Sequence, residues 1–240
     1  MSHTFFISDL HLRSTHRQIT AKFLEFMQQQ AAHAEALYIL GDLFEYWAGD
    51  DDLDQAFHQK ICAAIRALSQ HGTAVFIMCG NRDFLMGSAL AKACGATLLN
   101  DPTLINLYGQ PTLLSHGDTL CTDDVAYQNF REMVRGATWQ KQFLGQALAT
   151  RKQQIEALRA QSNQEKKQKE SRIMDVNTEA VCALLREHHY PIIIHGHTHR
   201  PAHHLIHLDD VTCHRWVLSD WDHTVRILRA SPDGIEFVTP

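Results

Sequence analysis

The sequence predicts a layered α/β fold, and three features support the prediction. In the first 80 residues, short apolar runs alternate with amphipathic helical patterns, an order typical of parallel strands connected by helices. From Trp216 onward, apolar runs follow one another with short turns, as antiparallel strands do. Between these regions, a long segment with helical composition interrupts the alternation. We therefore expect an α/β core built either on a mixed sheet or on two stacked sheets.

Five buried strands are expected where an apolar run ends at a polar residue. These runs occupy residues 5–8, 37–40, 75–79, 113–115 and 192–194. Two helices are expected between the first three strands, because apolar residues recur there at helical intervals. Their apolar faces carry Ile19, Phe23, Phe26 and Met27 in the first helix and Phe57, Ile61, Ala64, Ile65 and Leu68 in the second.

C-terminal strands and a helical cap complete the predicted fold. Strands are expected at residues 216–218, 225–228 and 235–238, with short turns between them such as Pro232-Asp233-Gly234. The segment from Thr122 to Val181 is free of proline and mostly helical in composition. We therefore expect residues 1–121 and 182–240 to form the core, and residues 122–181 to form an inserted cap.

The charge of the chain is unevenly distributed. A total of 22 Lys and Arg against 27 Asp and Glu gives a net charge of −5, which offers no global attraction to nucleic acid. Between Arg131 and Arg172, ten basic and four acidic residues give a local charge of +6 and leave −11 for the rest. An apolar stripe at helical spacing lies in this basic stretch and comprises Trp139, Phe143, Leu144 and Leu148. The pattern is typical of a helix on a membrane surface, and equally of a helix that packs on the core with its charges solvated.

The sequence also argues against several classes of protein. The six cysteines include no Cys-x-x-Cys pair, which disfavours a zinc ribbon or a disulfide framework and favours a reducing cytosol. No apolar run approaches the roughly 20 residues of a membrane-spanning helix. The N-terminus lacks the basic segment and apolar core of a signal peptide. We expect a cytoplasmic protein that is soluble or lies on a membrane surface.

Metal-binding side chains follow each of the five buried strands. They are Asp9 and His11, Asp42, Asn81, His116, and His197 and His199. Any one of them alone is more simply explained as a cap or turn residue, but the carboxyl ends of strands converge at one edge, where all seven would meet. Carboxylate, amide and imidazole ligands without thiolate suit Mn²⁺, Fe²⁺ or Zn²⁺. Seven ligands exceed what one ion needs, and two ions bridged by a carboxylate suit phosphoester hydrolysis.

The order of these motifs resembles that of the calcineurin-like metallophosphoesterases. The motifs are Asp9-Leu10-His11, Gly41-Asp42, Gly80-Asn81-Arg82-Asp83, His116-Gly117-Asp118 and Gly196-His197-Thr198-His199. The resemblance implies a two-layer β-sandwich flanked by helices. It also implies that one ion is held by Asp9, His11, Asp42 and His199 and the other by Asp42, Asn81, His116 and His197. Asp42 would then bridge the two ions.

Arg82 departs from the pattern of many members of the superfamily, which have histidine at this position. Arginine cannot donate a proton at working pH but binds phosphate oxygens through two hydrogen bonds, so we expect Arg82 to stabilise charge. Arg82 and the segments at residues 40–45, 49–52, 116–124, 173–177 and 195–201 are similar to those of the UDP-2,3-diacylglucosamine hydrolase family of lipid A biosynthesis, and the resemblance covers nearly the whole chain. That family uses manganese and water to cleave a pyrophosphate, releasing UMP and 2,3-diacylglucosamine 1-phosphate. The resemblance implies two Mn²⁺ ions and catalytic roles for Asp42 and Arg82. The basic cap with its apolar stripe, together with an acylated substrate, leads us to expect peripheral attachment to the cytoplasmic face of the inner membrane.

Substrate contacts follow from the same resemblance. They would be Asn81, Arg82, Asp124 and His197, with Ser162, Lys166 and Lys169 in the cap, where the match is looser. Acyl chains need an apolar groove, which would be lined by Trp47, Phe84, Trp139, Phe143 and Leu144, although these side chains equally suit an ordinary core.

Residues beside the motifs and two rival functions complete the predictions. We expect His195 to support the site from behind or to pack, and Cys79 and Cys121 to be small buried hydrophobes. A soluble phosphodiesterase or protein phosphatase with the same metals is an alternative, as is a metal-free binding scaffold. The presence of all seven ligands disfavours the scaffold.

Overall fold

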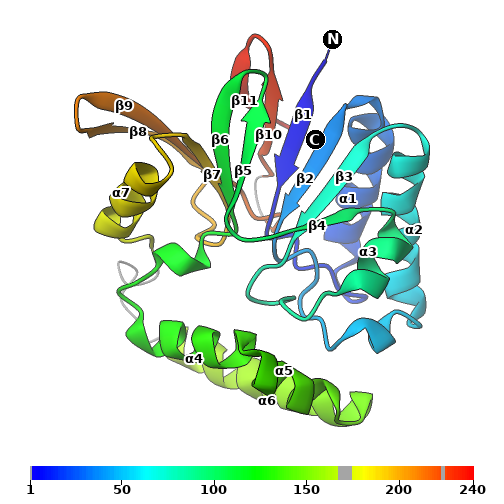
Figure 1. Ribbon diagram of the computed structural model, residues 1–240. Coiled ribbons are helices and arrows are strands. Elements are labelled where there is room, and N and C mark those ends of the chain that lie inside the picture. Colours follow the sequence, from blue (N-terminus) through cyan, green and yellow to red (C-terminus); the bar gives the residue numbers. More distant parts are fainter. Residues whose placement is uncertain (1, 167–174, 223–224) are drawn as a thin grey trace.

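The computed structural model describes residues 2–166, 175–222 and 225–240, and it contains two stacked sheets (Figure 1). The first sheet has the strand order β11-β10-β1-β2-β3-β4. Its parallel strands are β1 (Thr4–Ile7), β2 (Ala36–Leu40), β3 (Ala74–Met78) and β4 (Thr97–Leu99). Strands β10 (Ile227–Ser231) and β11 (Gly234–Val238) add an antiparallel hairpin at the β1 edge.

The second sheet has the strand order β5-β6-β7-β9-β8. Its strands are β5 (Thr103–Leu107), β6 (Gln110–Ser115), β7 (Ile192–His195), β8 (Ala202–Leu208) and β9 (Val211–Val217). Strands β6, β7 and β9 are parallel, and β5 and β8 are antiparallel to their neighbours. The sequence left open whether the core is one mixed sheet or two stacked sheets. The structure has two stacked sheets, and each of them is mixed.

Helices cover the outer face of each sheet (Figure 1). On the first sheet they are α1 (Arg17–Gln29), α2 (Ala56–Gln70) and α3 (Ser88–Cys94), and on the second α7 (Thr178–Glu187). The alternation of strand side chains explains the layers, because Phe5 and Ile7 face the first group of helices whereas Phe6 lies between the sheets. The fold is thus a two-layer β-sandwich flanked by helices, as predicted.

Three further helices lie below the sheets in Figure 1, within residues 122–181, where the cap is expected. They are α4 (Val125–Arg135), α5 (Ala137–Leu144) and α6 (Leu148–Lys166). Short 3-10 helices occupy Ala31–His33, Asp50–Asp52 and Asp118–Leu120. The three cap helices lie near the carboxyl ends of the parallel strands, because Arg135 of α4 donates a hydrogen bond to the Gly80 carbonyl after β3.

Two sequence predictions are wrong in detail. The single apolar stripe does not form, because α5 ends at Leu144 and a new helix begins at Leu148. Phe143 is buried in the core that covers the first sheet, whereas Leu144 is exposed. The strand predicted at residues 216–218 is the end of β9, which pairs in parallel with β7 instead of joining an antiparallel C-terminal sheet.

Candidate metal centre

The seven predicted ligands converge at one place between the two sheets. Asp9 and His11 follow β1, Asp42 follows β2, Asn81 follows β3, His116 follows β6, and His197 and His199 follow β7. Successive distances of 3.9 Å or less between their side-chain nitrogen and oxygen atoms connect all seven. The region beyond the strand ends therefore holds a continuous cluster of metal-binding groups.

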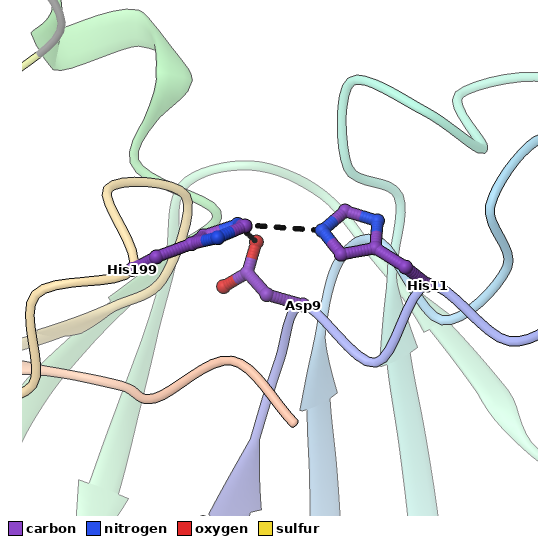
Figure 2. A group of neighbouring side chains, drawn as sticks. All are labelled: Asp9, His11 and His199. Carbon is purple, nitrogen blue, oxygen red and sulfur yellow. Dashed lines mark hydrogen bonds and ion pairs between the residues drawn. The ribbon is translucent and has the colours of Figure 1, made fainter. Parts of the chain in front are cut away.

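One part of the cluster contains two facing imidazoles and a carboxylate (Figure 2). The Nε2 atoms of His11 and His199 are 3.3 Å apart, and His199 Nε2 is also 3.3 Å from Asp9 Oδ1. Asp9 Oδ1 is buried and accepts no hydrogen bond from the residues that the structure describes. These three atoms enclose a position suited to a cation.

The other part of the cluster is centred on the Asn81 amide. Its Oδ1 atom lies 3.0 Å from His116 Nε2 and 2.9 Å from His197 Nδ1. Asp42 connects the two parts, because its Oδ1 is 3.8 Å from His116 Nε2 and its Oδ2 is 3.9 Å from His11 Nδ1. This central placement is the one that a bridging carboxylate needs.

The backbone at the site is held in an unusual conformation. Positive φ angles occur at Asp9 (53°), His11 (48°), Asp42 (54°), His197 (70°) and His199 (56°). Non-glycine residues rarely adopt this region, and each costs about 1–3 kcal/mol that the surrounding structure must supply. Gly80 is equally constrained, since a Cβ there would lie 2.1 Å from Asp42 Oδ1. The chain is therefore bent to aim these side chains inward.

Comparison with known proteins identifies the family. The model of the calcineurin-like phosphoesterase family matches residues 3–201, a range that includes all seven ligand positions. The chain belongs to the calcineurin-like phosphoesterases.

Its relatives within the phosphoesterases are similar over almost their whole length. A UDP-2,3-diacylglucosamine hydrolase of Aromatoleum aromaticum is 53% identical over 93% of this chain and 91% of its own. The enzymes of the same name from Edwardsiella ictaluri and Cellvibrio japonicus are 48% and 47% identical. They cover 98% and 97% of this chain, and the alignments span 91% and 96% of their own lengths.

Acceptor groups behind the histidines fix the orientation of two rings in this phosphoesterase site. The His116 Nδ1 atom donates a hydrogen bond to the Leu40 carbonyl at 2.9 Å, so Nε2 faces the cluster. The Nδ1 atom of His199 lies 3.2 Å from Asp220 Oδ2. Such contacts set the tautomer and angle of metal-binding imidazoles.

The donor set of the phosphoesterase site fits a divalent cation. Oxygen and nitrogen donors are gathered without a thiolate, and the buried Asp9 Oδ1 lacks a hydrogen bond from the described residues. Charges within the cluster also shift its pKa values. Burial lowers the pKa of His116, but Asp42 and Asp118 outweigh it and raise the pKa to about 9. Burial likewise lowers the pKa of His199, but Asp220 and Asp9 raise it to about 10.

These pKa shifts predict that cation binding releases protons. At pH 7 to 8 His116 and His199 are protonated before a cation binds, and a cation must displace those protons to reach the nitrogen lone pairs. We expect Mn²⁺ affinity to rise as pH increases from 7 toward 9. Calorimetric titrations in buffers of different ionisation enthalpy will count the protons released. Affinity that is independent of pH, with no proton release, would contradict the prediction.

Arg82 lies at the edge of the cluster and shares a carboxylate with a cap residue. Its Nη1 atom is 3.9 Å from Glu45 Oε1, and Arg159 of α6 contacts the same oxygen. The Arg82 backbone N–H donates a 2.8 Å hydrogen bond to Asp42 Oδ1. A phosphate bound at the cluster would therefore lie within the positive field of two guanidinium groups.

Many of the basic residues in the cap pair with acidic residues of the core. Asp118 Oδ2 accepts a hydrogen bond from Arg131 Nε at 2.8 Å, and Arg135 Nη2 lies 3.8 Å away. Two further contacts at the start of α6 join Arg151 to Asp51 and Lys152 to Asp52. Much of the positive charge of the cap is therefore used in ion pairs that hold the cap helices over the site. Fewer of the basic side chains are solvated than expected.

The remaining predicted substrate residues lie at different places. Asp124 caps α4, because its Oδ1 accepts a hydrogen bond from the Tyr127 backbone N–H at 3.2 Å. Ser162 lies in α6 and is half-buried. Lys169 and the side chain of Lys166 lie outside the described residues.

The side chains predicted to line an acyl groove differ in their exposure. Trp47 is fully buried and stacks on Phe44 at 4.9 Å, so it belongs to the core. Trp139 is half-buried and stacks on the buried Phe143 at 4.6 Å. Leu144 is 41% exposed.

The histidine and cysteines beside the motifs are buried or half-buried. His195 is fully buried and donates from Nδ1 to the Gly196 carbonyl at 2.9 Å, and burial lowers its pKa to about 4. Its side chain packs behind the site. Burial also raises the pKa values of the Cys79 and Cys121 thiols to about 12, which leaves both unreactive at neutral pH.

Sequence reasoning missed several residues that contact the cluster. Asp220 follows the strand predicted at residues 216–218, so the strand-end argument itself would have identified it. Tyr127 donates a 2.6 Å hydrogen bond to Asp118, and its ring stacks on His197 at a centroid distance of 6.0 Å. No spacing in the sequence signals that contact, because it joins a cap helix to the core.

Proposed function

We propose that this protein hydrolyses the pyrophosphate bond of UDP-2,3-diacylglucosamine in lipid A biosynthesis. Water attacks the α-phosphorus, the bond from that phosphorus to the bridging oxygen breaks, and the products are UMP and 2,3-diacylglucosamine 1-phosphate. The observation that supports this substrate most strongly is the 47–53% identity to hydrolases of that name over more than nine-tenths of the chain. The similarity therefore includes the cap as well as the metal-binding motifs.

The cofactor in this proposal is a pair of Mn²⁺ ions. One would be held by Asp9, His11, Asp42 and His199, and the other by Asp42, Asn81, His116 and His197. Bound divalent cations supply positive charge for phosphoryl oxygens and lower the pKa of water. The central position of Asp42 supports its role as the bridging ligand.

Substrate binding in this proposal uses both the core and the cap. Arg82, with Asn81 and His197 beside it, would bind the diphosphate, because a guanidinium matches phosphate oxygens. Asp124, Ser162, Lys166 and Lys169 would contact the remainder of the substrate. We place the cap at residues 122–181, with acyl chains lying beneath its helices.

The exposed apolar side chains of the cap support attachment to the cytoplasmic face of the inner membrane. Val125 is 63% exposed and Met133 is 52% exposed on α4, and Leu158 is 42% exposed on α6. A diacylated substrate resides in a membrane, and apolar side chains beside basic ones favour binding to its surface. Among the described residues, no helix is long and apolar enough to cross a bilayer.

The membrane proposal predicts the effect of adding charge to α4. Val125→Glu combined with Met133→Glu should lower the fraction of protein that sediments with anionic phospholipid vesicles by about tenfold, because each charge must be desolvated at the surface. The exposed Val211 lies on β9, outside the cap, and Val211→Glu is the matched control. Equal sedimentation of all three proteins would contradict the membrane proposal.

Hydrolysis in water enriched in ¹⁸O tests the function directly. The purified protein is incubated with UDP-2,3-diacylglucosamine, with and without Mn²⁺, and both products are identified by mass. We expect labelled UMP to form only with Mn²⁺. Manganese-dependent cleavage of an aryl phosphodiester without cleavage of the lipid substrate would instead indicate a soluble phosphodiesterase.

Arg82→Ala should lower kcat/KM by about 10²-fold while leaving both Mn²⁺ ions bound. Removing one pre-oriented donor to a reacting oxyanion typically costs about 10²–10³-fold. Arg82 contributes only its backbone N–H to Asp42, which alanine retains. Steady-state kinetics and a Mn²⁺ titration check the two halves of the prediction. Unchanged kinetics would show that the guanidinium does not touch the reacting phosphate.

A further inference from the structure

Glu45 lies beside the cluster of metal-binding side chains. Its loop is hydrogen-bonded through the backbone to the loop that carries His11. Beyond β1 and β2, the His11 N–H donates to the Asp42 carbonyl at 2.9 Å, and the Leu12 N–H donates to the Leu43 carbonyl at 2.9 Å. The Glu45 N–H then donates to the Leu12 carbonyl at 3.1 Å. These bonds extend the parallel pairing past the strand ends, so the position of Glu45 relative to His11 is fixed by the backbone.

The Glu45 carboxylate faces three groups at once. Its Oε2 is 3.7 Å from His11 Nδ1, and its Oε1 is 3.9 Å from Arg82 Nη1 and also contacts Arg159. The side chain is only 13% exposed. A carboxylate so enclosed holds these partners more strongly than it would in water.

The orientation of His11 explains why an acceptor is needed behind it. Its Nε2 faces His199 Nε2 at 3.3 Å, on the side where Asp9 completes the donor set. When Nε2 gives its lone pair to a cation, Nδ1 carries the proton. That Nδ1 is buried and has no hydrogen-bond partner among the described residues. Among the described residues, Glu45 Oε2 at 3.7 Å is nearer to it than Asp42 Oδ2 at 3.9 Å.

We propose that Glu45 is a positioning residue that orients His11 for the cation and Arg82 for the phosphate. One oxygen accepts a hydrogen bond from His11 Nδ1–H once the two atoms, 3.7 Å apart, move about 0.5 Å or more closer. Such a bond fixes the ring, as carboxylates commonly do behind metal-bound histidines. The other oxygen holds Arg82 and Arg159 at the edge of the cluster until phosphate oxygens replace it. This inference deepens the proposed function and rests on it for the phosphate.

A Mn²⁺ titration of two Glu45 variants tests the role toward His11. Glu45→Ala removes the acceptor, and Glu45→Gln keeps an acceptor but loses the charge. Loss of such a partner typically costs about 10–100-fold in metal affinity. We expect calorimetry to show one Mn²⁺-binding step weakened by that factor in Glu45→Ala and by less in Glu45→Gln, with the other step unchanged.

The role toward Arg82 is tested by combining substitutions. In the Glu45→Ala background, Arg82→Ala should reduce kcat/KM several-fold less than it does in the wild type, because the guanidinium is no longer held in place. Glu156→Ala is the control, since Glu156 is an exposed acid of the same charge on α6. It should change neither Mn²⁺ affinity nor the effect of Arg82→Ala.

Wild-type Mn²⁺ affinity in both Glu45 variants would overturn the inference, whatever the substrate proves to be. The metal titration contains no substrate, so its result stands even if UDP-2,3-diacylglucosamine is not cleaved. Conversely, cleavage by the wild type together with unchanged titrations would reject the role of Glu45 and leave the proposed function intact.

Discussion

Asp42→Asn should lower kcat by about 10³-fold or more, which corresponds to about 4 kcal/mol of lost transition-state stabilisation. Asp42 connects the two parts of the cluster, through Oδ1 toward His116 and Oδ2 toward His11. An asparagine offers one neutral oxygen in place of two charged ones, so it cannot bridge two cations. We expect turnover to be lost and Mn²⁺ binding to weaken at both positions.

Asparagine is the better substitution here because it preserves the backbone. Asp42 has a φ of 54°, a conformation that asparagine adopts readily and alanine does not. Its Oδ1 also accepts the Arg82 N–H, a bond that the amide oxygen retains. The exposed Asp54 supplies the control variant Asp54→Asn. Near-normal rates of UMP formation in Asp42→Asn would refute the bridging role, and a loss in Asp54→Asn would point to a general effect of charge.

The convergence of the seven predicted ligands could be expected from the order of the chain alone. Each buried run ends at a polar residue, and parallel strands bring those ends to one edge, so the convergence of Asp9 and Asn81 follows from the pattern. That pattern does not predict whether neighbouring strands of the second sheet run parallel or antiparallel. Strand β9 pairs in parallel with β7, because β8 lies between them in the chain and forms a hairpin with β9. Strand β8 was not predicted, because three of its seven residues are histidines and hide the alternation of apolar and polar residues.

The side-chain partner of His11 could not be predicted from the sequence. Glu45 Oε2 lies 3.7 Å from His11 Nδ1 where the chain bends with a positive φ angle at His11, and no residue spacing encodes such an angle. The basic charge of the cap was equally ambiguous in sequence. Its pairing with core acids, such as Arg131 with Asp118, depends on two segments that meet only in the folded chain.

Asp118→Asn should destabilise the fold by about 3 kcal/mol, because it breaks a buried ion pair between the core and the cap. The Asp118 side chain is fully buried and accepts hydrogen bonds from Tyr127 at 2.6 Å and Arg131 at 2.8 Å. For a chain of this size the thermal midpoint should fall by about 6–12 °C. Asp118 lies two residues after His116, so its contacts with Tyr127 and Arg131 also set the position of α4 relative to the cluster of metal-binding side chains. The exposed Asp233 of the β10–β11 hairpin supplies the control Asp233→Asn, which should melt like the wild type.

The destabilisation should also depend on pH in a defined direction. Burial raises the pKa of Asp118, but the charges of His116, Arg131, His197 and Arg135 outweigh it and hold the pKa well below its ordinary range. A depressed folded-state pKa contributes stability that is present above about pH 4, the unfolded value, and is lost as pH falls toward the folded value. Asparagine has no such dependence at this position. Melting curves from pH 7 to pH 2.5 should therefore show the gap between Asp118→Asn and the wild type narrowing below pH 4. A gap that stays constant across this range would mean that Asp118 stabilises the cap through its shape and neutral hydrogen bonds, without its charge.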